Sequence, residues 1–145
     1  MKKTNFTLPA MEHKFSIQVK GEESGINWVG DFNYRRPNLQ ERAMVDVMRA
    51  RLNGDLRTLD PDVMAFNEAL AHLRFTVKDY PEWWAESDFG GKLYDANVVL
   101  EVYNKCIEFE GEWRKKVHSG EPDDVEEGKA DVAKDKKPAG ASAGA

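Results

Sequence analysis

The stretch Trp28-Val-Gly-Asp-Phe-Asn-Tyr-Arg-Arg-Pro-Asn-Leu-Gln-Glu41 decides the fold, because an alternating strand pattern runs directly into a helix start. The same period of two also precedes the turn Gly21–Gly25. The alternating apolar side is formed by Phe15, Ile17, Val19, Ile26, Trp28, Gly30, Phe32 and Tyr34. Two such runs around a glycine-bounded turn predict an antiparallel β-hairpin over residues 14–35. A hairpin alone is marginal in water, so its aromatic side is expected to pack on helices.

Three helices are predicted after the hairpin. Pro37 ends the second strand, and Asn38 followed by Glu41 has the spacing of a capping box, which predicts a helix over about 39–53. One side of that helix is apolar and carries Met44, Val47, Met48 and Leu52. Caps at Asp60-Pro61 and Asp95 precede apolar residues spaced by three and four, which predict helices over 61–78 and 95–117. The sequence therefore predicts an α+β fold in a single domain, residues 14–117.

The two ends of the chain are expected to lie outside this domain. Residues 1–13 have no regular pattern and are predicted to form a flexible arm, too polar for a secretion signal. Residues 118–145 are acidic and rich in Ala and Gly, and this composition predicts a disordered tail. That tail holds seven acids and four lysines of a chain with net charge −5, so the predicted domain is nearly balanced. Such a balance provides no general attraction to nucleic acid, and no apolar run is long enough to span a membrane.

The sequence predicts no catalytic, cofactor or metal site, and we therefore expect a protein that is not an enzyme. His13, His72 and His118 lack the spacing of metal ligands. Cys106 is the only cysteine, which excludes an internal disulfide and fits a reducing cytoplasm. It lies on the apolar side of the last predicted helix, where a free thiol behaves as a small apolar group. Gly90-Gly91 has no phosphate-loop pattern and is interpreted as a break between helices.

Two groups of residues are candidates for contact with a partner. Arg35 and Arg36 flank the strand end, where guanidinium groups suit phosphate recognition. The alternative is that they pack on aromatic rings and pair with Glu41 or with a partner's carboxylates, and this interpretation is favoured. The segment around Pro81 carries a cluster of aromatic side chains, namely Tyr80, Trp83, Trp84 and Phe89. These rings either close the open end of a small core or form an exposed protein-binding surface.

The order of features resembles that of small tail-assembly proteins of tailed bacteriophages. A strand ending in Phe-Asn-Tyr-Arg-Arg-Pro-Asn38 leads into helices, and the last helix contains Phe-Glu-Gly-Glu-Trp-Arg114. Proteins of that group have an Arg-Arg-Pro-Thr-like turn at the matching place, and Asn38 replaces Thr with an equivalent capping group. The resemblance covers about residues 14–117.

This resemblance implies a non-enzymatic tail-assembly chaperone that binds the tape-measure protein, or another tail protein, in the host cytoplasm. The contact residues expected for that role are Arg35, Arg36, Trp83, Trp84 and Phe89, with Met44 and Met48 as adaptable groups if their side is only partly covered. The alternatives are a virion structural protein or adaptor and, less favoured, a nucleic-acid-binding accessory protein. Self-association is left open.

Overall fold

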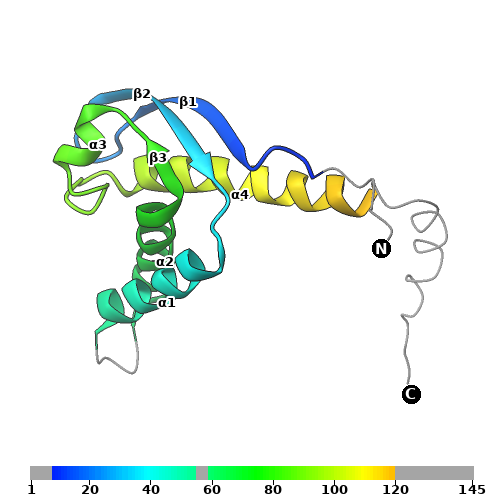
Figure 1. Ribbon diagram of the computed structural model, residues 1–145. Helices are drawn as coiled ribbons and strands as arrows, with labels where there is room; N and C mark the ends of the chain where they lie inside the picture. Colours follow the sequence, from blue (N-terminus) through cyan, green and yellow to red (C-terminus); the bar gives the residue numbers. More distant parts are fainter. Residues whose placement is uncertain (1–7, 55–58, 120–145) are drawn as a thin grey trace, which may run out of the picture. The chain divides into compact units, whose positions relative to one another are not determined.

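The computed structural model describes residues 8–54 and 59–119 of the chain. Within these residues, three antiparallel strands in the order β1-β2-β3 form one sheet, and four helices accompany it (Figure 1). The elements are β1 (Glu12–Lys20), β2 (Asn27–Arg35), α1 (Leu39–Asn53), α2 (Pro61–Thr76), β3 (Val77–Asp79), α3 (Glu82–Glu86) and α4 (Ala96–Ser119). The predicted α+β class, with an N-terminal hairpin on helices, is confirmed.

The predicted hairpin is present, with Phe15 opposite Phe32 and Ile17 opposite Gly30. Its turn is closed by Gly21, whose N–H donates to the carbonyl of Ile26 at 2.8 Å. Strand β1 begins at Glu12, so the expected arm of residues 1–13 is too long at its C-terminal end. Residues 1–7 of that arm lie outside the described residues.

Helix α1 starts where the capping box predicted. The Asn38 side chain accepts from the Glu41 N–H at 2.8 Å, and the Glu41 carboxylate accepts from the Asn38 N–H at 3.0 Å. The two bonds satisfy amides that the first turn of a helix leaves without partners. Gly54 ends the helix with a φ of 68°.

The predicted helix over 61–78 is two residues too long. Helix α2 ends at Thr76, and the backbone becomes extended at Val77. Strand β3 then pairs with β2, with Val77 opposite Tyr34 and Asp79 opposite Asn33. The β-branched side chain of Val77 continues the apolar spacing of α2, which is why periodicity alone extended the helix into β3.

Residues 10–110 form a compact unit whose core lies between the inner side of the sheet and the helices (Figure 1). The buried cluster contains Ile17, Phe32, Tyr34, Ala69, Leu73, Val77, Trp84, Val98, Val99, Val102 and Cys106. Helix α3, which the sequence did not predict, supplies Trp84 to this cluster. The aromatic side of the hairpin is therefore covered as expected.

A second unit contains the end of α4 from Gly111 onward together with Leu8 and Pro9. Within it the Trp113 Nε1 donates to the carbonyl of Pro9 at 3.4 Å. Helix α4 continues to Ser119, so the predicted tail, which was expected from residue 118, starts two residues too early. The remainder of the predicted tail, residues 120–145, lies outside the described residues.

Candidate functional site

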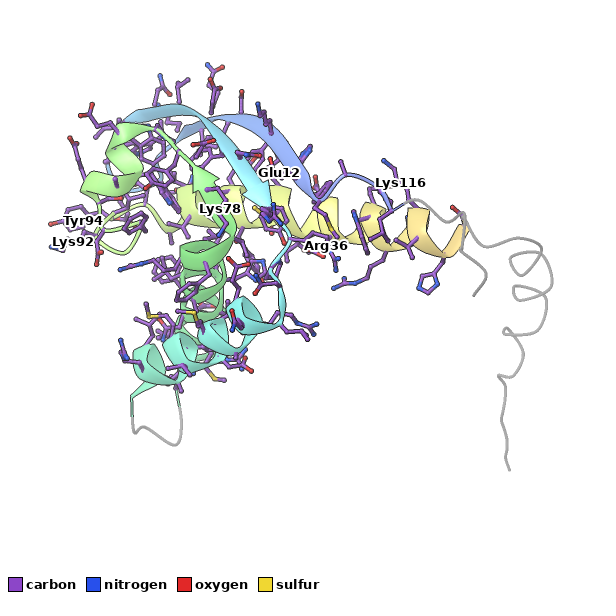
Figure 2. The ribbon with its side chains drawn as sticks, viewed as in Figure 1. Glu12, Arg36, Lys78, Lys92, Tyr94 and Lys116 are labelled. Carbon is purple, nitrogen blue, oxygen red and sulfur yellow. The ribbon has the colours of Figure 1, made fainter. Side chains whose placement is uncertain are left out.

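Helix α1 exposes much of the apolar side that the sequence predicted. Val45 is its only buried residue, while Met44 is 49%, Val47 60% and Leu52 41% exposed. Helix α2 adds exposed apolar side chains at its start, Val63 and Met64. We call these five residues, Met44, Val47, Leu52, Val63 and Met64, the α1–α2 apolar surface. Figure 2 shows sulfur-bearing side chains gathered around this pair of helices.

Polar contacts join α1 to α2 on another side of α1. Arg49 donates to Glu68 at 2.8 Å, and Asn67 donates to Asn53 at 2.9 Å. The ion pair with Glu68 raises the pKa of Arg49. These polar pairs do not involve Met44 and Val47, whose side chains remain exposed. Arg49 therefore bridges the two helices.

The aromatic residues selected as contact sites have different environments. Trp84 is fully buried, with its ring edge-on to Phe32 at a centroid distance of 5.4 Å. Trp84 therefore presents no surface to a partner, and its assignment as a contact residue is corrected. Its burial is decided by the turn of α3, which places two consecutive tryptophans on different sides.

Trp83 and Phe89 are half-buried. The Trp83 Nε1 donates to the carbonyl of Val29 at 2.9 Å, and its ring lies 4.7 Å from that of Trp28. Phe89 lies beneath the Arg74 guanidinium at 4.5 Å. Both residues close the end of the core beside α3 while keeping part of their surface in solvent. Their role as contact residues stays a prediction.

The two arginines of the strand end have separate carboxylate partners, and neither is the expected Glu41. Arg35 is exposed and lies 3.5 Å from Glu12. Arg36 is partly buried and donates to Glu110 on α4 at 2.9 Å (Figure 2). Arg36 therefore anchors the strand end to the helix, whereas Arg35 keeps an accessible guanidinium.

Glu110 is the centre of a buried polar cluster. The Tyr34 hydroxyl donates to Glu110, and the His72 Nε2 lies 3.4 Å from the same hydroxyl. Burial, with Glu110 as acceptor, raises the pKa of Tyr34. Burial also lowers the pKa of His72, although the charges of Glu110 and Glu68 oppose that shift. At neutral pH the cluster holds a protonated phenol and a neutral imidazole, an arrangement that ties β2, α2 and α4 together.

Cys106 is buried beside this cluster, as its position on the apolar side of the helix predicted. Burial, and to a lesser extent Glu110, raises the pKa of the thiol. A nucleophilic cysteine requires a thiolate, so the environment of Cys106 favours the inert form. Within residues 8–54 and 59–119, no cluster of three or more His, Cys, Asp or Glu side chains is arranged to hold a metal ion.

Asp95 has a role that the sequence did not indicate. The sequence predicted a helix cap, but the buried carboxylate accepts from the Glu23 and Ser24 amides at 2.7 and 2.9 Å. It also accepts from the Ser24 hydroxyl and from the Trp28 Nε1. These donors, the Ser24 hydroxyl first, hold the pKa of Asp95 near 2. Asp95 thus fixes the hairpin turn to the start of α4, a contact between residues about 70 positions apart.

Comparisons with known proteins found no family model, no curated protein and no solved structure that matches this chain. None of the helices in the described part of the chain is both long and apolar enough to cross a membrane.

Proposed function

We propose that this protein is a non-enzymatic chaperone of phage tail assembly, which holds a helical segment of the tape-measure protein on the α1–α2 apolar surface. The observation that carries the proposal is the exposure of Met44, Val47 and Leu52 on a helix that contributes only Val45 to the buried residues. A helix that leaves its long apolar side chains in water gains stability when a partner covers them.

The composition of this surface suits a helical partner. Methionine side chains are flexible and polarizable, so they adapt to apolar groups of different shape. An amphipathic helix presents apolar residues at intervals of three and four, which can lie along a pair of helices. A tape-measure protein is long and helical, and its segments need such cover before the tail tube assembles around them. This correspondence supports a holding role over a catalytic one.

The resemblance to phage tail-assembly proteins supports the same role from the order of elements. The Arg35-Arg36-Pro37-Asn38 turn lies between strand β2 and helix α1, which is its place in that group. Burial favours the uncharged forms of the Tyr34 phenol and the Cys106 thiol, so neither group is prepared to act as a nucleophile at neutral pH.

The test is co-expression of the full chain with a tape-measure protein, followed by affinity purification. Met44→Glu and Val47→Glu place charges in the α1–α2 apolar surface and are expected to reduce capture at least about tenfold together, since interface side chains contribute about 1–2 kcal/mol each. Ile107→Glu is the matched control, because Ile107 is 42% exposed on α4. Trp83→Ala tests one of the two remaining aromatic contact residues, the other being Phe89.

Three results would contradict the proposal. The first is equal capture by wild type and by the α1 double variant. The second is detection of the protein in finished virus particles at a stoichiometry typical of a structural component. The third is salt-sensitive binding of nucleic acid that disappears in Arg35→Ala, which would assign the accessible guanidinium to a nucleic-acid-binding role.

A further inference from the structure

Strand β1 is an edge strand with one side of its backbone directed away from the sheet. The sheet order is β1-β2-β3, so β1 has a neighbouring strand only on the β2 side among the described residues. The Gly21 N–H bonds to the Ile26 carbonyl, and the Arg36 N–H bonds to the Met11 carbonyl at 2.9 Å. Hydrogen-bonded residues alternate along an antiparallel pair. The odd-numbered residues of β1 therefore bond to β2, and the even-numbered residues direct their N–H and C=O groups outward.

Unlike β1, strand β2 has neighbours on both of its sides. Strand β3 pairs with β2 at Asn33, and Trp83 donates to the Val29 carbonyl. At the end of β1, the Asn97 side chain donates to the Lys20 carbonyl at 2.9 Å. Within the described residues, no such hydrogen bond covers the outward backbone groups of the other even-numbered residues of β1, which are Glu12, Lys14, Ser16 and Gln18.

We propose that two copies of this chain pair edge to edge through β1, antiparallel and centred on Ser16, to form a continuous six-stranded sheet. In this register Glu12 lies opposite Lys20 of the second copy, and Lys14 lies opposite Gln18. Opposite charges on directly facing residues stabilise an antiparallel pair. The outward even-numbered side chains of β1 are exposed, so they are accessible for these pairs.

Neighbouring registers are less favourable. Moving the centre to residue 17 sets Lys14 opposite Lys20, and moving it to residue 14 sets two copies of Lys14 against each other. A centre at residue 15 leaves Glu12 opposite Gln18 and loses the opposite-charge pair. Among the registers centred on residues 14 to 17, only the one centred on Ser16 joins acid to base at both ends while avoiding like charges.

The inner side of the sheet also continues across this pair. Phe15 would lie opposite Ile17 of the second copy, and His13 would lie opposite Val19. Phe15 and Val19 are only partly buried in one chain, so pairing covers apolar surface in addition to joining backbone groups. The β1 edge shares no residue with the α1–α2 apolar surface. The dimer proposal is therefore independent of the proposed function.

The first test compares Ser16→Pro with Ser16→Ala by sedimentation equilibrium of the full chain. Proline removes the outward N–H of Ser16 and leaves the β1–β2 bonds in place, so dimerisation is expected to weaken at least about tenfold. Alanine removes only the hydroxyl that donates to Asp31, and we expect dimerisation within about twofold of wild type. Circular dichroism and melting temperature identify any loss of fold in the proline variant.

The second test exchanges the charges at the two ends of β1 and does not depend on a proline in the strand. Glu12→Lys and Lys20→Glu alone each set like charges opposite each other at both ends, which is expected to weaken the dimer about tenfold. The double variant restores the pairs and is expected to return to within about threefold of wild type. Figure 2 marks Glu12 at the start of β1. A wild-type chain that stays monomeric at about 1 mM, or a double variant no better than the singles, would overturn the proposal.

Discussion

Replacing Trp84 with alanine should destabilise the fold more than any change at the neighbouring aromatic positions. Trp84 is fully buried, and its ring lies edge-on to Phe32 at 5.4 Å and to Trp83 at 5.9 Å. Truncating a buried tryptophan typically costs about 3–5 kcal/mol, because transfer energy is lost and a cavity remains. That range is comparable with the whole stability of a small domain, about 5–15 kcal/mol.

The indole N–H reduces this cost. Trp84 Nε1 is buried and has no hydrogen-bond partner among the described residues. An unsatisfied buried donor costs about 1–3 kcal/mol, which alanine removes. We therefore expect a net loss of about 2–4 kcal/mol for Trp84→Ala. Trp84→Phe keeps most of the ring and also removes the N–H, so it should cost less than half as much.

Urea unfolding followed by far-ultraviolet circular dichroism measures the loss. With a slope of about 2 kcal/mol per molar urea, the midpoint of Trp84→Ala should fall by about 1–2 M. Tyr94→Ala is the control, since Tyr94 is 86% exposed and should change stability by no more than about 0.5 kcal/mol. A Trp84→Ala midpoint equal to that of the control would refute the burial of this ring.

Three further predictions concern the hairpin turn and the half-buried His72. The pKa of Asp95 is lowered from 3.8 to about 2, so its contribution to stability is complete above pH 3.8 and is lost as the pH falls through 2. In Asp95→Asn, the free energy of unfolding from chemical denaturation should therefore depend less on pH across that range. A methyl group at Gly21 would overlap the Asp95 carboxylate, so Gly21→Ala should lower the melting temperature, whereas Gly111→Ala on α4 meets no atoms and should preserve or raise it. Burial lowers the pKa of His72 from 6.5, so folding stability should be complete above that pH and decrease below it; His72→Phe should reduce this dependence between pH 7 and 5 in chemical denaturation.

The elements whose signals lie within a few neighbouring residues were predictable from the sequence. The capping box of Asn38 and Glu41 involves residues three positions apart, and its bonds form as the spacing predicted. The hairpin likewise follows from alternation around one turn. Strand β3 was missed because three residues carry no periodicity of their own, and only the pairing of Val77 with Tyr34 defines them as a strand.

The candidate site was less predictable, because amphipathic spacing shows which side of a helix is apolar but not whether another element covers it. Helix α1 illustrates the difference. Its hydrogen bonds to α2 use Arg49 and Asn53, while Met44 and Val47 remain exposed. Trp83 and Trp84 are consecutive, so no sequence pattern distinguishes the buried ring from the half-buried one. Both results depend on contacts between distant segments.

Most of the residues that carry the resemblance to phage proteins make contacts within the folded chain. They are therefore less available to a partner than the sequence suggested. Tyr34 enters the core and donates to Glu110, and Arg36 donates to the same carboxylate. Pro37 follows the strand, and Asn38 caps α1. Arg36 has its carboxylate partner within the folded chain whether or not a second protein binds. For this reason the proposals above place recognition on other residues, those of the α1–α2 apolar surface and of β1.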